Sequence, residues 1–210
     1  TAPGSSKLGP ALRVTRAIRE NMKYPLPNLL FFVSLVAFVG CSDSGPTSVP
    51  KTFVTIYAPI EFSFPSGWHK SKQKNPFDLQ CFSRFERINT AVFVFKQTDF
   101  TTSTESRQIL ETQIEDLRSK RKKFNLFERK AVSQVKGKKI TTVVYSGEKG
   151  GDRNLYKFSL IDFDDDKSIF AVVLQIALPE DWENSKSIFE QILHSAKNLN
   201  RVEKGSGGNG

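Results

Sequence analysis

The sequence predicts an α+β fold in which a single antiparallel sheet carries helices on both faces, as an α/β/α sandwich. Strand-like segments follow one another through short links, which favour antiparallel pairing. Two stretches, within 105–124 and 179–199, have apolar residues at helical spacing. Two strands, 90–97 and 168–178, are apolar on both sides and therefore need cover on both faces.

Short strands come first. Residues 53–57 and 62–64 are strand-like, and the turn signal Pro65-Ser66-Gly67 stops the second of them. Residues 79–86 and 90–97 follow as two strands with a short connection around Ile88. This half of the chain therefore supplies several adjacent strands before any helix.

The first helix is predicted to begin after the capping segment 102–105 and to run to Phe124. Its last turns are strongly basic, which suits the negative end of a helix. We interpret these cations as the solvated end of a helix. The alternatives are contact with anionic lipid and, less favoured, contact with nucleic acid. The residues are Arg118, Lys120, Arg121, Lys122 and Lys123.

Four strands and a helix complete the predicted order. The strands are 126–135, 140–146, 155–163 and 168–178, and Gly-containing turns separate the first three. Pro179 then opens a final helix. Its apolar stripe consists of Trp182, Ile188, Phe189, Ile192, Leu193, Ala196 and Leu199.

Composition excludes some classes of protein. The chain has 210 residues, 38% of them hydrophobic and 25% charged, which fits neither a fully disordered chain nor a polytopic membrane protein. The net charge is +9, but five of the Lys and Arg residues and only one acid lie in the first 40 residues. The remainder is only mildly basic, so we expect no nucleic-acid partner.

A short apolar run near the start predicts an export signal. Residues 29–39 contain one Ser and no charge, which is too short to span a bilayer and fits a signal core. Met22 is the only Met and Lys23 supplies positive charge, so we expect a signal peptide over residues 22–40. Residues 1–21 are then an upstream extension that is not native.

The residues that follow resemble the bacterial lipoprotein signal. Val39, Gly40 and Cys41 match its box, whereas Phe38 stands where Leu is usual. The resemblance implies cleavage before Cys41 and acylation of its thiol, which makes membrane lipid a partner. A plain secretory signal cleaved near Ala37, or a buried strand with an incidental Cys, are the alternatives.

Two polar segments flank the body, which we place at 52–200. Residues 41–51 are small, polar and rich in Pro and Gly, as expected of a flexible tether. Residues 201–210 read as a disordered tail. If Cys41 is acylated, Cys81 has no disulfide partner and is expected to be a buried structural thiol, a reactive thiol being the alternative.

No constellation in the sequence predicts catalysis, a metal or a cofactor. The run from Asp162 to Asp166 lacks the Gly and Glu of an EF-hand loop and reads as a hairpin turn. Two Cys and two His leave little for a zinc site, and His69 and His194 are far apart in sequence. The common nucleophile, phosphate and dinucleotide motifs are absent from the sequence.

Two motifs resemble the PsbP-like and DcrB-type bacterial proteins. Residues 62–68 read Phe-Ser-Phe-Pro-Ser-Gly-Trp, like the family's aromatic strand followed by Pro and Gly-Trp. Residues 188–197 read Ile-Phe-Glu-Gln-Ile-Leu-His-Ser-Ala-Lys, like its closing helix. The resemblance implies an antiparallel α/β/α sandwich. It also implies a protein that binds other proteins, as photosystem subunits, periplasmic lipoproteins, effector chaperones and a nuclear-transport relative do.

The sequence thus predicts a lipoprotein at the cell envelope, facing the periplasm or the exterior. Its PsbP-like body is expected to be a non-catalytic protein-binding or assembly module, with a protein partner in a membrane complex. An enzyme with an unrecognised site, or a cytosolic effector-chaperone-like protein if the leader is not a signal, are the alternatives.

Overall fold

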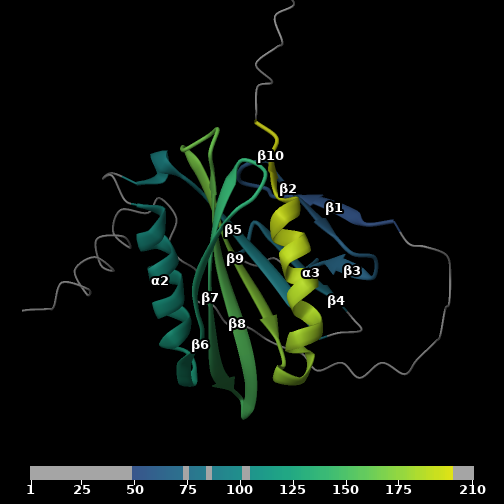
Figure 1. Cartoon of the computed structure of the whole chain (residues 1–210), viewed down its shortest axis with the longest axis vertical. Coiled ribbons are helices and arrows are strands. Elements are labelled where there is room, and N and C mark those ends of the chain that lie inside the picture. Colours follow the sequence, from purple (N-terminus) through teal and green to yellow (C-terminus); the bar gives the residue numbers. More distant parts are fainter. Residues whose placement is uncertain (1–48, 73–75, 84–86, 101–104, 201–210) are drawn as a thin grey trace, which may run out of the picture.

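The computed structural model describes residues 49–72, 76–83, 87–100 and 105–200. Its main element is a seven-stranded sheet in which every neighbouring pair is antiparallel (Figure 1). The strand order is β3-β4-β5-β9-β8-β7-β6. The strands are β3 (Trp68–Lys70), β4 (Leu79–Ser83), β5 (Asn89–Lys96), β6 (Lys122–Gln134), β7 (Lys138–Lys149), β8 (Asp152–Phe163) and β9 (Ile169–Ala177).

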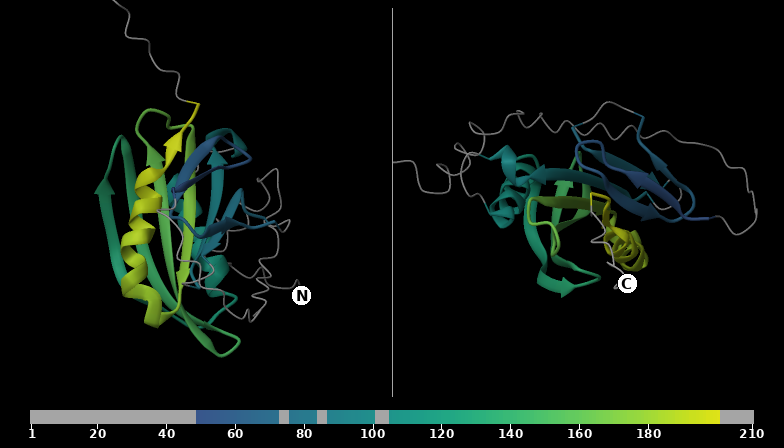
Figure 2. Two further views of the ribbon diagram at one scale, coloured as in Figure 1. Left: turned by 90° about the vertical axis from the view of Figure 1, so that its right-hand side faces the viewer. Right: turned by 90° about the horizontal axis from the view of Figure 1, so that it is seen from above.

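Two helices cover opposite faces of this sheet, as predicted (Figure 2). Helix α2 (Ser106–Arg118) carries the chain from β5, through the short η1 (Gln97–Asp99), to the opposite edge strand β6. Helix α3 (Trp182–Ser195) follows β9 and the short η2 (Pro179–Asp181). Each helix buries its apolar stripe on the sheet, and Ile109 and Phe189 are fully buried.

The doubly apolar strands occupy the centre of the sheet. β5 and β9 pair along their whole length and are almost entirely buried. Val92 and Val173 face the core under α3, whereas Phe93 and Val172 face the core under α2. The sequence predicted this arrangement, because a strand that is apolar on both sides is stable only between two covering layers.

The prediction of one sheet is wrong, because the first strands build a second, smaller one. β1 (Lys51–Val54), β2 (Ile60–Phe64) and β10 (Lys197–Asn198) form this antiparallel sheet. It lies on the α3 side, where Ile60, Phe62 and Phe64 join the same core as α3. Gly67, with φ of 82°, then turns the chain into β3 of the main sheet.

The two motifs that resemble the PsbP-like proteins meet in this region. The Ser195 hydroxyl at the end of α3 accepts a hydrogen bond of 2.8 Å from the Ser63 backbone N–H on β2. Phe64 packs on Trp68 with ring centroids 5.3 Å apart, and Trp68 is buried. The aromatic strand and the closing helix therefore form one packed unit, although 132 residues separate Ser63 from Ser195.

Both predicted helices are longer than the observed ones. α2 ends at Arg118, because Phe124 is buried from β6 and the chain has already changed to a strand. α3 ends at Ser195, because Lys197 and Asn198 pair with β2, and Leu199 beyond them is exposed. In both cases strand pairing overrides an apolar spacing that would suit a longer helix.

Residues with positive φ, most of them glycines, form the hairpin turns in the second half of the chain. Lys136 and Gly137 have φ of 49° and 74°, and Gly150 and Gly151 have φ of 64° and 99°. Two consecutive residues with positive φ are typical of the two-residue turns whose twist matches antiparallel strands. These turns fix the β6–β7 and β7–β8 registers.

Lys138 begins β7 and is buried at the end of α3. Its Nζ donates hydrogen bonds to the backbone carbonyls of His194, at 2.9 Å, and Ala196, at 2.5 Å. Burial, together with nearby Lys136 and Lys197, lowers the pKa of Lys138 from 10.5 to about 8. The ammonium group therefore satisfies carbonyls at the negative end of α3 at the cost of desolvating a charge.

This arrangement makes stability depend on pH in a defined window. Because the folded-state pKa of Lys138 lies below its unfolded value, the unfolded chain binds more protons between about pH 8 and 10.5, and stability rises with pH there. Between pH 7 and pH 10, we expect the unfolding free energy of the wild type to rise by about 2 kcal/mol more than that of Lys138→Met. Denaturant titrations at each pH measure this, and a constant difference would contradict it.

Cys81 on β4 is fully buried among apolar side chains, which matches the expectation of a structural thiol. Burial raises the pKa of Cys81 to about 12, so hardly any thiolate forms near neutral pH. In a chain carrying Cys41→Ser, we expect iodoacetamide at pH 8 to leave the folded protein unlabelled and to label it fully in guanidinium. Mass spectrometry measures the labelling. If the folded protein is labelled rapidly, the prediction is refuted.

Candidate functional site

The basic segment after α2 forms a turn and the start of a strand. Arg118 is the last residue of the helix, Lys120 and Arg121 lie in the turn, and Lys122 and Lys123 open β6. The expectation that all five cations lie at a helix end is therefore wrong for Lys122 and Lys123. Lys123 has φ of 47° at a register shift between Lys122 and Asn125, which is typical of a β-bulge.

The two arginines of this segment pack on aromatic rings. The Arg118 guanidinium lies 5.4 Å from the ring centroid of Phe124 and 5.8 Å from that of Tyr145. Arg121 Nε donates a hydrogen bond of 2.8 Å to the Tyr156 hydroxyl. Burial raises the pKa of Tyr156, and Arg121 opposes that shift. These contacts join the end of α2 to the sheet, because cations bind the faces of aromatic rings.

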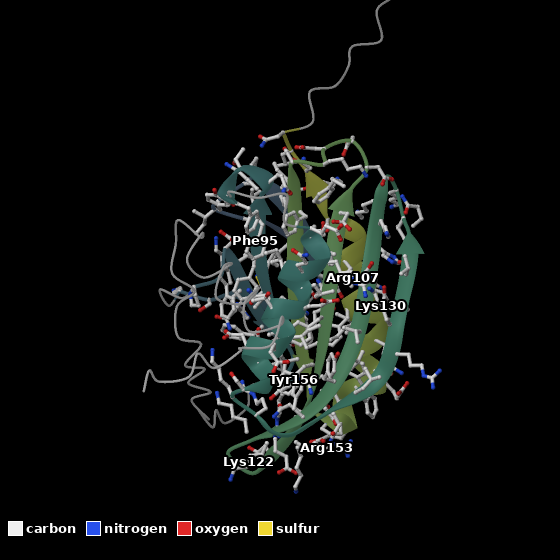
Figure 3. All side chains as sticks on the ribbon, turned by 90° about the vertical axis from the view of Figure 1, so that its left-hand side faces the viewer. Phe95, Arg107, Lys122, Lys130, Arg153 and Tyr156 are labelled. Carbon is white, nitrogen blue, oxygen red and sulfur yellow. The ribbon has the colours of Figure 1, made fainter. Side chains whose placement is uncertain are left out.

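A glycine allows this packing. A Cβ on Gly147 would lie 2.9 Å from Cδ2 of Phe124 and 3.3 Å from Cβ of Arg121. Such separations are shorter than normal contact, so only Gly lets the segment pack closely on β7. Tyr156 lies near the end of α2 in Figure 3, and Lys122 and Arg153 lie close to one another at that end of the molecule.

Carboxylates compensate most of the remaining charge here. Lys120 Nζ lies 3.0 Å from Asp116, Arg118 lies 3.0 Å from Glu115, and Lys123 lies 2.8 Å from Glu148. Within the described part of the chain, Lys122 has no ion pair or hydrogen-bond partner for its side chain. Of the five candidates for membrane contact, four are therefore engaged in contacts that hold the fold.

A second charged group lies beneath α3. Lys157 on β8 is buried and forms an ion pair with Glu190 of α3, whose carboxylate also lies 3.3 Å from Nε2 of His194. Gln175 on the neighbouring strand donates to the carbonyl of Phe189. These contacts fix α3 on the sheet. Sequence reasoning missed Lys157, whose signal is a single charge within an otherwise apolar strand.

An open hollow of about 410 Å³ lies at the end of the main sheet. It is bounded by the β6–β7 hairpin, the β8–β9 connection and the start of α2, and charges of both signs line it. Asp164 already accepts a hydrogen bond of 2.5 Å from Gln134. The lining residues are Gln97, Glu105, Ser106, Gln134, Lys139, Asp162, Phe163, Asp164, Lys167, Ile169 and Phe170.

The acidic run 162–166 forms the β8–β9 connection, as expected of a hairpin turn. Hydrogen bonds from the Ser168 hydroxyl and backbone N–H lower the pKa of Asp166, and Asn198 donates to the same carboxylate. In the residues that the structure describes, no three His, Cys, Asp or Glu side chains gather as metal ligands would. Asp164 and Asp166 accept hydrogen bonds from neighbouring residues in and around this turn.

The other candidates from the sequence are distributed between the core and the undescribed segments. Trp68 and Trp182 are buried. His69 lies on β3 with its ring 6.3 Å from that of Phe82, on the far side of the sheet order from β6. Cys41, the signal 22–40, most of the tether 41–51 and the extensions 1–21 and 201–210 lie outside the described residues.

Within the described ranges, no helix has both the length and the hydropathy that crossing a membrane requires.

Three exposed large apolar residues lie on β6, where Leu126, Phe127 and Val132 are 55%, 44% and 59% exposed. The others among the described residues are Val49, Val54, Ile56 and Leu199. β6 is an edge strand, and nearly all its side chains are exposed. Sequence reasoning predicted a strand here and missed that it is an edge. The mixture of apolar and charged residues without clean alternation is the available signal.

Comparisons with known proteins identify the fold. The model resembles the solution structure of cyanobacterial PsbP (CyanoP) from Synechocystis sp. PCC 6803, with a TM-score of 0.52 and 16% identity over 76% of this chain and 98% of that one. It also resembles the crystal structure of LpqN, involved in cell envelope biogenesis of Mycobacterium tuberculosis, with a TM-score of 0.51 and 12% identity over 73% of this chain and 86% of that one.

No protein-family model and no curated protein sequence matches the chain. The similarity to known proteins is thus structural, and it agrees with the two sequence motifs that meet at β2 and α3. The antiparallel main sheet, its two covering helices and the small second sheet together give this chain the PsbP-like fold.

Proposed function

We propose that the chain is a lipid-anchored protein of the bacterial cell envelope, whose PsbP-like body binds other proteins and has no catalytic role. The observation that carries this proposal is the apolar run 29–39 followed directly by Gly40 and Cys41, ahead of a compact folded body. A signal core of that length with a Cys at its end is what lipid attachment requires. Two or three acyl chains then give durable attachment to a membrane.

The arrangement of the body agrees with this role. The first described strand, β1, begins at Lys51, so a polar segment of about ten residues separates Cys41 from the fold. An extended chain of that length spans roughly 30 Å, which allows the body to stand clear of the headgroups. Of the candidates for contact with anionic headgroups, Arg118, Lys120, Arg121, Lys122 and Lys123, only Lys122 lacks an internal partner within the described residues.

Binding is favoured over catalysis by where the chemical groups lie. The described ionisable groups whose pKa is most displaced, Cys81 and Lys138, are buried on different strands, and neither lines the hollow at the end of the main sheet. Catalytic groups usually converge on one pocket, whereas binding modules present an exposed surface. LpqN, a structural neighbour, is described as involved in cell envelope biogenesis, which supports an assembly role in a membrane complex.

Metabolic labelling tests the anchor. In a bacterial host with lipoprotein processing, we expect the wild-type chain to incorporate radiolabelled palmitate and to fractionate with membranes. Cys41→Ala removes the only thiol that the signal places for acylation, so its label should fall to background. Cys81→Ala is the matched control, because it removes the other, buried Cys and should keep the label. Absence of label in the wild type, or label that survives Cys41→Ala, would overturn the proposal.

A further inference from the structure

The outer edge of β6 is the least covered part of the sheet. β6 pairs with β7 on one side and is the last strand in the sheet order, so no strand of the described chain occupies its other side. Only Phe124 of its side chains is buried. An edge strand of this length offers unpaired backbone N–H and C=O groups to another polypeptide.

The register of β6 limits where such pairing can occur. Register shifts interrupt β6 between Lys122 and Asn125, between Leu126 and Glu128, and between Glu128 and Ala131. Bulges of this kind bend an edge and disturb its hydrogen-bonding pattern. From Ala131 to Gln134, by contrast, each residue pairs in continuous register with β7. This final stretch is therefore the regular template for an added strand.

Cations without partners surround that template. Arg129, Lys130 and Lys136 are exposed, and the structure gives none of them an ion pair or side-chain hydrogen bond with another described residue. Two acids that contact this part of the fold have other partners. Glu128 accepts from Trp182 and lies 3.0 Å from Lys186, and Asp164 accepts from Gln134 and lies 3.7 Å from Lys167. Within the described part of the fold, none of the three cations is therefore paired with a carboxylate.

Apolar surface accompanies the charge. Val132 lies opposite Thr141 in the register, and Leu126 lies opposite Tyr145, so both side chains are on the face of the sheet that α2 covers elsewhere. Both are more than half exposed, because α2 packs on β8 rather than on β6. Figure 3 shows this face, with Lys130 on the outer strand.

We infer that residues 129–134 together with Lys136, here named the β6 edge surface, bind an extended acidic segment of a partner protein as an added β-strand. Apolar side chains at the centre of such a segment would meet Val132, while carboxylates on either side of them would meet Arg129, Lys130 and Lys136. This inference rests on the proposed binding function and names its surface and the chemistry of its partner.

Charge and backbone together select this occupant. A second copy of the chain paired across the same edge would bring like cations together, which destabilises a cross-strand pair. An anionic membrane would match the charge, but its headgroups offer no regular ladder of donors and acceptors that could pair with an edge strand. An acidic polypeptide satisfies both requirements, because it supplies carboxylates and a complementary backbone ladder.

A defined peptide tests the inference. The probe is an eight-residue fluorescent peptide with two central Val residues and three Glu residues on each side of them, titrated by anisotropy against the full chain carrying Cys41→Ser. We expect saturable binding, and we expect amide NMR shifts at 131–134. The double variant Arg129→Glu/Lys130→Glu should weaken binding at least tenfold. Both side chains are exposed, so folding should be unchanged, which the melting temperature checks.

Three controls separate the alternatives. The double variant Lys51→Glu/Arg153→Glu makes the same charge change at exposed residues of β1 and β8 and should change affinity less than twofold. The same peptide with alternate backbone nitrogens methylated keeps its charge but cannot form a ladder, and should not bind. Equal affinity of the methylated peptide, or equal weakening by both double variants, would show simple charge attraction and overturn the inference.

Two further outcomes would also overturn it. One is the absence of peptide binding while phosphatidylglycerol vesicles bind the wild type and not Arg129→Glu/Lys130→Glu. The other is dimerisation of the chain alone that the same variant abolishes, measured by sedimentation. Either result would leave the lipid anchor standing if palmitate still labels Cys41, so failure of this inference and failure of the proposed function are distinguishable.

Discussion

Burial of the main sheet on both faces is the constraint on which the rest of the structure depends. β5 and β9 carry apolar side chains on both sides, so the chain must provide two covering layers. α2 supplies one, while α3 and the small sheet of β1, β2 and β10 supply the other. The crossing of α2 from β5 to the far edge and the return of β9 to the centre both follow from that requirement.

Much of this arrangement could be predicted from local patterns. The doubly apolar strands, the two helical stripes and the Gly-containing hairpins depend on neighbouring residues, and each is found in its predicted region, although both helices end earlier than predicted. The second sheet could not be predicted in the same way. The turn at Gly67 shows that the chain changes direction, but only long-range packing of Phe62 and Phe64 against α3 decides which sheet they join.

In the candidate sites, too, the local residue pattern could be predicted and the long-range contacts could not. The basic composition of residues 118–123 was visible in the sequence, but the stacking of Arg118 and Arg121 on aromatic rings depends on β6, β7 and β8. The helical spacing that ended at Phe124 was equally compatible with a bulged strand. The edge position of β6 was also missed, because the sequence signal for it is only the lack of clean alternation, whereas the sheet order shows it directly.

We propose that the exposed edge strand β6, on a body held at a membrane, is where the protein binds its partner. Hydrogen–deuterium exchange of the lipid-anchored protein in its native membranes, compared with the purified protein, tests this claim most directly. We predict that the amides of residues 131–134 exchange rapidly in the purified protein. In native membranes a bound partner should slow their exchange, while the exchange of β5 and β9 should change little. Unchanged exchange along β6, with new protection confined to another surface, would contradict it.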